Sequence, residues 1–244
     1  MIKVAAVSYL NTIPFIYGLR NSLIFEKVKL SLDFPSICAA KLLNNQVDIA
    51  LVPIVVLPKL HYYHIISDYC IGANGAVDTV CLFSDVPISE IQSIALDYQS
   101  HTSVELLKVL LREYWNLSPK LIKSELGFED TVKGKHAALV IGDRAFCLNN
   151  KHKYIYDLSA VWKQMTGLPF VFAVWVANIE LPQKFIVDFN KALSKGLNKK
   201  EELLSSQEYI STICKDPEDY LNNKISYTFD IEKQKAMDLF LSKI

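Results

Sequence analysis

Arginine is scarce in this sequence of 244 residues, where Arg20, Arg112 and Arg144 are the only three. Lysine and arginine together number 26 and are balanced by 26 acidic residues, so the formal net charge is zero. Nucleic acids and anionic membrane surfaces usually recruit proteins with a basic excess, so the composition argues against both as main partners. A site built on several bidentate arginine–carboxylate pairs is also disfavoured. A small anionic ligand would have to be held mainly by backbone N–H groups and hydroxyls.

Cysteine is sparse as well, with 5 residues spread along the chain and no CxxC pair. Such a pattern predicts reduced thiols that pack as small apolar groups. The residue spacing that metal ligands require is missing. We therefore expect no metal and no cofactor.

No apolar run approaches the roughly 20 residues that a membrane helix needs. The chain starts with Met1, Ile2 and Lys3 and leads directly into a short apolar stretch that reads as a buried strand rather than a secretory signal. We expect a cytoplasmic protein with no membrane partner. Hydrophobic residues make up 51% of the chain, enough for a sizeable core.

The common catalytic motifs are missing too. The sequence contains no GxSxG, no GxxxxGK, no HExxH and no GxGxxG. Their absence disfavours the common hydrolases, the kinases and the nicotinamide-dependent enzymes.

Short apolar runs alternate with amphipathic helical stretches, which is typical of an α/β architecture. Two runs, Val80–Ser84 with its flanks and Phe170–Val176, are long for single strands. One interpretation is that each crosses between two lobes as a hinge, which would create a cleft for a small ligand. The other is that both are central strands of one sheet, and the pattern alone leaves the two open.

Polar residues at the end of a strand and the start of a helix are the candidate site residues. In open α/β sheets the ligand crevice lies beyond the carboxyl ends of the strands, where helix starts offer free N–H donors. The first such place is Ser8 to Thr12, where the planar amide of Asn11 could orient a hydroxyl or a carboxylate. Alternatively, Asn11 or Thr12 caps the next helix, which has Pro14 in its first turn.

The head of the predicted helix 100–117 is the strongest candidate. Ser100, Thr102 and Ser103 place three hydroxyls beside unpaired N–H groups, which would make a carboxylate or phosphate cradle without arginine. The alternative is a redundant capping box that Glu105 completes. His101 could act as an acid or base, or could face solvent.

Three further places are less specific. Ser36 could contact a ligand or cap the helix that begins near it. The segment 72–79 has two glycines that allow close backbone approach to a ligand, or simply form a turn. Asp143 could orient a ligand group or pair locally with Arg144.

Five segments occur in an order that resembles a known family. They are VSYLNTIPF, FPS with KLL and VDIALVP after it, LDYQSHTSVELLKVLL, AALVIGDRA and WKQMTGLPFVFAVW. Together they resemble the chorismate dehydratases of the futalosine route to menaquinone, over residues 3 to 177. The sister lyase of that route, which cleaves cyclic dehypoxanthine futalosine, typically has a start ending in Asn-Asp-Thr, where this chain has Tyr-Leu-Asn-Thr.

The resemblance implies a type II periplasmic-binding-protein fold. In that fold each of two lobes is a mixed sheet flanked by helices, and two hinge strands join the lobes. Residues 1–82 plus 175–244 would form the first lobe and residues 83–174 the inserted second lobe. The substrate cleft would lie between them.

The resemblance also implies roles for residues. Asn11 would be the catalytic residue. The substrate-binding residues would be Ser8, Tyr9, Thr12, Ser36, Thr79, Ser100, Thr102, Ser103, Gly142 and Asp143. Thr79 stands where relatives often have serine, which keeps the hydroxyl. His101 stands where they often have arginine, which suggests that its side chain faces outward.

The implied reaction removes water from chorismate to give 3-[(1-carboxyvinyl)oxy]benzoate. Because no protein base stands out in the sequence, we expect the enolpyruvyl carboxylate of the substrate to take the proton. Two rival functions remain at this stage. One is a non-catalytic cytosolic binder of a small carboxylate metabolite, and the other is the sister lyase.

Overall fold

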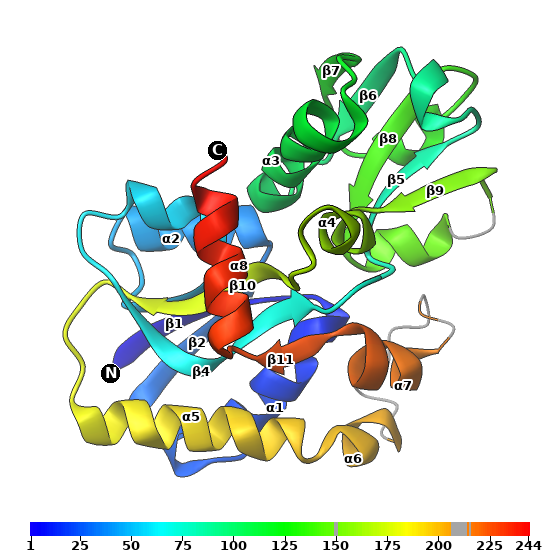
Figure 1. The fold of residues 1–244 in the computed structure, drawn as a ribbon. Helices are drawn as coiled ribbons and strands as arrows, with labels where there is room; N and C mark the ends of the chain where they lie inside the picture. Colours follow the sequence, from blue (N-terminus) through cyan, green and yellow to red (C-terminus); the bar gives the residue numbers. More distant parts are fainter. Residues whose placement is uncertain (149–150, 206–213, 215) are drawn as a thin grey trace.

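The computed structural model describes residues 1–148, 151–205, 214 and 216–244, and two mixed sheets organise them (Figure 1). The six-stranded sheet has the order β11-β4-β10-β3-β1-β2. Its strands are β1 (Ile2–Val7), β2 (Val28–Asp33), β3 (Ile49–Pro53), β4 (His64–Ala73), β10 (Phe170–Ala177) and β11 (Ser226–Thr228). Strand β1 pairs in parallel with β2 and β3, whereas β10 runs antiparallel to β3 and β4.

The five-stranded sheet has the order β7-β6-β8-β5-β9. Its strands are β5 (Val80–Ser84), β6 (Ser93–Leu96), β7 (Lys120–Lys123), β8 (His136–Ile141) and β9 (Tyr154–Asp157). Strand β6 pairs in parallel with β7 and β8, and β5 is antiparallel to β8 and β9. Both sheets are therefore mixed, as predicted.

Helices cover both faces of the larger sheet. Figure 1 shows α1 (Ile13–Arg20) and α5 (Gln183–Leu197) on one face, with α2 (Pro35–Leu43) and α8 (Ile231–Leu241) on the other. The smaller sheet carries α3 (His101–Leu110) and α4 (Leu158–Thr166). The short helices α6 (Lys200–Ser205) and α7 (Pro217–Asp219) follow α5. No helix in the described part of the chain is long and apolar enough to span a bilayer.

The central strands are short and almost wholly apolar because both of their faces are covered. Residues 4–7 of β1 and all of β3 are buried. The carboxyl end of β1 therefore emerges from the core at residue 8. It leads into a 3₁₀ turn, Leu10–Thr12, that carries the first candidate site residues.

The two long runs differ from the hinge prediction in their pairing. Among the described residues, β5 pairs within the smaller sheet alone and β10 within the larger one alone. The register of β10 with β4 has two irregularities, the first with an extra residue in β10 and the second with extra residues in β4. The predicted boundaries at 82/83 and 174/175 fall inside these two strands. The chain in fact passes between the sheets at 74–79 and again between β9 and β10. The division into lobes itself stays a prediction.

Two local predictions also differ from the structure, and one strand was not predicted. Helix α2 begins at Pro35 with Phe34 before it, so Ser36 lies inside the first turn and does not cap. The helix predicted over 100–117 changes after Leu110 into a π-helical turn and ends where Asn116 adopts a left-handed conformation, φ 53°. Strand β9 was not predicted.

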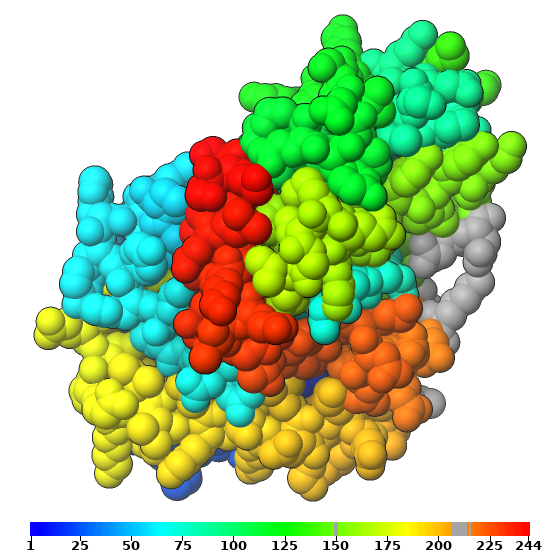
Figure 2. All heavy atoms as spheres, in the orientation of Figure 1, coloured from blue at the N-terminus to red at the C-terminus, as the bar shows by residue number. Residues whose placement is uncertain are grey.

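The carboxyl terminus joins the two halves of the molecule. Figure 2 shows the end of α8, in red, against the green segment that follows α3. Arg112 donates to the carbonyl of Lys243 at 2.7 Å, and the amine of Lys243 lies 2.5 Å from Glu113. We call the larger sheet with its helices the larger unit, and the smaller sheet with its helices the smaller unit. These contacts tie the last residues of the larger unit to the smaller unit.

Candidate functional site

A cavity of about 60 Å³ lies between the two sheets. Its walls come from the end of β1, the passage before β5, the head of α3, the end of β8 and β10. The predicted site residues along it are Tyr9, Asn11, Thr12, Thr79, Ser100, Ser103 and Gly142. Residues far apart in the sequence thus meet where the ends of strands from both sheets face each other.

Four predicted site residues are not among those that line the cavity. Ser8 is exposed, and its backbone N–H donates to the carbonyl of Asp33 at 3.0 Å. Ser36 is partly buried in the first turn of α2. The hydroxyl of Thr102 donates to the carbonyl of Phe172 at 3.3 Å. The fourth is Asp143, whose carboxylate accepts a hydrogen bond from the backbone N–H of Leu10 in the 3₁₀ turn.

The Asn11 amide does not cap a helix. The structure assigns no side-chain capping bond to Thr12 before α1 or to Tyr9 before the 3₁₀ turn. Instead, the Thr12 hydroxyl donates to Oδ1 of Asn11 at 3.0 Å, and Nδ2 of Asn11 donates to the Tyr220 hydroxyl at 3.3 Å. The capping alternative is wrong for both residues, and the amide is held at the cavity wall.

Tyr220 connects two of the predicted site residues. Its hydroxyl lies 2.9 Å from Oγ1 of Thr79 and also accepts from Asn11. Burial raises the pKa of this phenol, so it stays protonated at neutral pH. Sequence reasoning missed Tyr220, because 209 positions separate it from Asn11 and no local pattern marks it.

The head of α3 combines capping with exposure to the cavity. Ser100 is the N-cap: its Oγ accepts from the backbone N–H of Ser103 at 3.2 Å and donates to the Ser103 hydroxyl at 3.0 Å. Glu105 pairs with Lys108 at 2.7 Å and does not complete a capping box. His101 is exposed, which confirms the expectation that its side chain faces outward. The helix start supplies the positive end of a dipole at the cavity.

Residues that follow β1 form hydrogen bonds to residues beside the smaller sheet. The Tyr9 hydroxyl donates to Oε1 of Gln99 at 2.5 Å, and the N–H of Leu10 donates to the Asp143 carboxylate at 3.3 and 3.4 Å. Gly142 adopts φ 68°, and a Cβ built on it would lie 2.9 Å from Cζ of Tyr9. A glycine is therefore needed both for the backbone conformation and for the packing of the Tyr9 ring.

Arg144 lies outside the cavity wall and braces the segment behind it. It contacts Asp97 and Glu129, each at 2.6 Å, so the alternative of a local pair with Asp143 is wrong. Asp97 also accepts from the N–H groups of Gln99 at 2.8 Å and Ile141 at 2.9 Å. Burial raises the Asp97 pKa, and Arg144 opposes that rise. This buried carboxylate holds Gln99 in place for Tyr9.

The described lining of the cavity is neutral. Among the residues that the structure describes there, none is aspartate, glutamate, lysine, arginine or histidine. Within the described ranges, no group of three histidine, cysteine, aspartate or glutamate side chains could hold a metal ion. Oriented N–H groups and hydroxyls in such a mainly apolar space act on developing charge far more strongly than they would in water.

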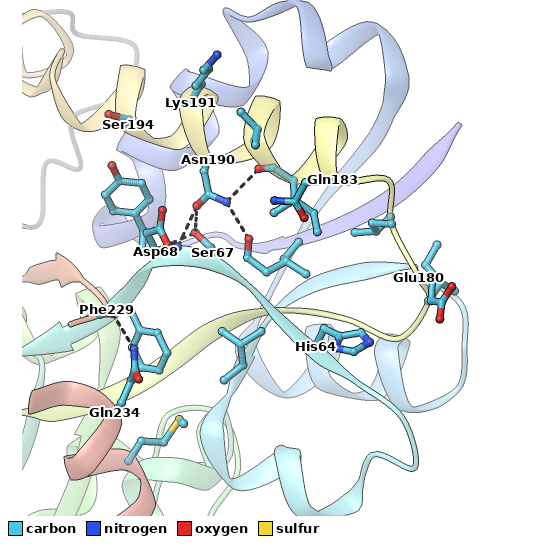
Figure 3. Close-up of a pocket in the computed structure, with 18 of the residues that line it drawn as sticks. His64, Ser67, Asp68, Glu180, Gln183, Asn190, Lys191, Ser194, Phe229 and Gln234 are labelled. Atoms are coloured by element: carbon cyan, nitrogen blue, oxygen red, sulfur yellow. Dashed lines mark hydrogen bonds between the residues drawn. The ribbon is translucent and has the colours of Figure 1, made fainter. Parts of the chain in front are cut away.

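A larger groove lies elsewhere, over the larger sheet. It has a volume of about 1130 Å³ and runs between α5, α8 and the first half of β4, as Figure 3 shows. Asn190 reaches from α5 to this edge of β4, where it accepts from Ser67 and Asp68 and donates to the carbonyl of Ile66. The groove contains none of the predicted site residues. We therefore assign the candidate site to the smaller cavity.

Sequence comparison then places the chain in a family. A family model described as menaquinone biosynthesis matches residues 2–244, almost the whole length. The chain belongs to this family. A chorismate dehydratase of Thermus thermophilus is 28% identical to this chain over 219 residues, which cover 82% of this chain and 79% of that protein.

Solved structures agree on the fold of this menaquinone biosynthesis protein. Protein AF1704 of Archaeoglobus fulgidus superposes with a TM-score of 0.73 at 12% identity, covering 99% of this chain and 96% of its own. A Candida albicans protein with the generic periplasmic binding protein fold gives 0.66 at 12% identity, covering 98% and 90%. The alkanesulfonate-binding protein of Xanthomonas axonopodis, bound to MOPS, gives 0.63 at 11% identity, covering 99% and 92%. The predicted periplasmic-binding-protein-like fold is confirmed.

Proposed function

We propose that this protein is a chorismate dehydratase, a carbon–oxygen lyase that removes water from chorismate to give 3-[(1-carboxyvinyl)oxy]benzoate. The observation that carries the proposal is the neutral cavity in which the Asn11 amide, the Thr79 hydroxyl and the start of α3 converge. Membership of the menaquinone biosynthesis family and the Thermus relative support it.

The reaction asks little of the protein. The ring C–H bond at the ether-bearing carbon breaks, the neighbouring hydroxyl leaves, and the proton and hydroxide together amount to water. The product ring is aromatic, which supplies a large driving force. The protein must hold two carboxylates and stabilise the charge that builds on the ring carboxylate.

The start of α3 suits that charge-stabilising role. Its backbone N–H groups and the hydroxyls of Ser100 and Ser103 lie at the cavity, where a carboxylate would face the positive end of the helix dipole. Asn11 would hold the departing hydroxyl or the enolpyruvyl carboxylate. In this arrangement the anionic substrate needs no arginine, as the composition suggests.

The proton acceptor in the proposed mechanism is the enolpyruvyl carboxylate of the substrate. Tyr9 is the ionisable side chain along the cavity, but its hydroxyl donates to Gln99 and burial raises its pKa. It therefore cannot serve as a base at neutral pH. A carboxylate that belongs to the substrate itself arrives already positioned and ionised.

Substrate entry requires the cavity to widen. Its volume of about 60 Å³ is well below the roughly 300 Å³ at which small-ligand pockets begin. We propose that the units around the two sheets separate, breaking the Tyr9–Gln99 and Leu10–Asp143 hydrogen bonds, and close again on the substrate.

Purified protein incubated with chorismate is expected to form the aromatic product, which ultraviolet absorbance follows directly. Chorismate without protein is the blank. Thermal stabilisation by chorismate without turnover would instead favour a non-catalytic binder, a function common among proteins of this fold. If neither effect is seen, the same assay with cyclic dehypoxanthine futalosine tests the sister lyase.

Cell fractionation tests the cytoplasmic location that we propose for such a biosynthetic enzyme.

Replacing His101 by alanine is expected to leave both limbs of the pH–rate profile in place, because this side chain is exposed and points away from the cavity. The profile of kcat/KM measured for both proteins checks this. Loss of one limb in the variant would make His101 the acid or base and would rule out proton transfer to the substrate carboxylate.

A further inference from the structure

A buried tyrosine from the C-terminal part of the chain reaches the centre of the candidate site. Tyr220 begins the π-helical turn Tyr220–Lys224 that follows α7, and only 2% of its surface is exposed. Its hydroxyl contacts Asn11 at 3.3 Å and Thr79 at 2.9 Å. One side chain thus links the turn after β1 with the passage between the sheets.

The hydrogen bonds around Tyr220 form one directed chain. Thr12 donates to Oδ1 of Asn11, so Nδ2 is the amide end that faces Tyr220 and donates to it. The Thr79 hydroxyl donates to the carbonyl of Val77 at 3.4 Å, which leaves Tyr220 as the donor to Thr79. Each hydroxyl and the amide therefore have a single consistent orientation.

The surroundings keep Tyr220 in this position. Its ring packs edge-on against Phe146 of the smaller unit, with ring centroids 5.0 Å apart. Four residues along the chain, Lys224 pairs with Asp78 at 3.1 Å, which ties the same turn to the passage between the sheets. Burial raises the pKa of the Tyr220 phenol, so the donor to Thr79 persists throughout the neutral range.

We propose that Tyr220 is a positioning residue that sets the orientation of the Asn11 amide and the Thr79 hydroxyl toward the substrate. The inference rests on the proposed dehydratase function. A primary amide has two N–H donors, and Tyr220 engages only one of them. In this proposal the other N–H donates to the substrate, and the amide cannot flip to present Oδ1 without losing both of its present bonds.

The experiment compares Tyr220→Phe with Tyr227→Phe. Tyr227 is a matched control, because its hydroxyl is also buried and also contacts Asn11, but donates to the backbone carbonyl at 2.9 Å. We expect Tyr220→Phe to lower kcat about tenfold with KM changed less than about threefold, the loss typical of one hydrogen bond in the transition state. Tyr227→Phe should lose much less kcat at a similar loss of melting temperature. Equal losses of kcat in the two variants would overturn the proposal.

A second readout does not depend on turnover. The side-chain amide signal of Asn11 in a ¹H–¹⁵N spectrum, assigned by its loss in Asn11→Asp, should shift in Tyr220→Phe and stay in place in Tyr227→Phe. If the wild-type protein does not convert chorismate, the proposed function fails and this signal alone decides the role of Tyr220. An unmoved signal in Tyr220→Phe rules that role out. If Tyr220→Phe does not fold, Thr79→Val removes the acceptor from the same chain and must shift the same signal.

Discussion

Asn11→Ala is expected to lower kcat by about a hundredfold or more, the loss seen when one donor to a developing negative charge is removed. The amide lies buried at the cavity wall, with only 9% of its surface exposed. Its present bonds to Thr12 and Tyr220 hold it in one orientation without using all of its donors. Because the lost group is a donor to charge that develops in the transition state, the effect should fall on kcat.

Steady-state kinetics with chorismate separate the two possible roles of Asn11. A fall in kcat and kcat/KM together marks an interaction made in the transition state, whereas a raised KM with unchanged kcat would reduce Asn11 to a binding residue. Asn198→Ala is the control, because Asn198 is exposed at the end of α5. Unaltered kinetics in Asn11→Ala would contradict the assignment of this cavity as the active site.

Gly196→Ala is expected to lower the free energy of unfolding by about 4 kcal/mol or more, a loss that single substitutions cause only when they severely disrupt the core. Helices α1 and α5 cross here with backbone against backbone. A Cβ on Gly196 would lie 1.7 Å from the carbonyl oxygen of Pro14 and 2.9 Å from the N of Gly18. Because backbone atoms cannot rotate away as a flexible side chain would, the two helices must move apart.

Denaturant unfolding of the wild-type protein and of Gly196→Ala measures this loss. Ser194→Ala on the same helix is the control. Ser194 is partly buried, and its replacement should change the free energy of unfolding by less than about 0.5 kcal/mol. A loss below about 1 kcal/mol in Gly196→Ala would show that α1 can shift at little cost. Since α1 follows directly on the turn that carries Asn11, the folded fraction of the variant should also have reduced kcat.

Much of the local structure follows from the sequence because its causes are local. The buried strands β1 and β3 follow from short apolar runs, and the α3 start follows from Ser100, whose bond to Ser103 spans three residues. Gly167 ends α4 with φ 75°, the left-handed conformation that glycine commonly adopts at the end of a helix. The place of Asn11 at the end of a buried strand follows in the same way.

Predictions that depended on a choice between near and distant partners were less secure. Asp143 and Arg144 are neighbours, yet Arg144 contacts Asp97 and Asp143 contacts Leu10. A sequence lists neighbours along the chain, and it cannot show that a buried carboxylate 47 positions away offers the better partner. The strand β9 was missed for a related reason, since its pairing with β5 provides the evidence for it.

By itself, the sequence determined the alternation of strands and helices, the place of Asn11 after a buried strand and the Ser100 cap of α3. These features depend on residue type and on short-range hydrogen bonds, and such local structure forms in the same way in many proteins. The sequence did not separate the hydroxyls that line the cavity from those of Ser8, Ser36 and Thr102, which do not. Only the tertiary structure decided which sheet each long strand joins and that Tyr220 contacts Asn11 and Thr79 across 209 and 141 positions. Such contacts arise when the sheets pack together, and no local pattern encodes them.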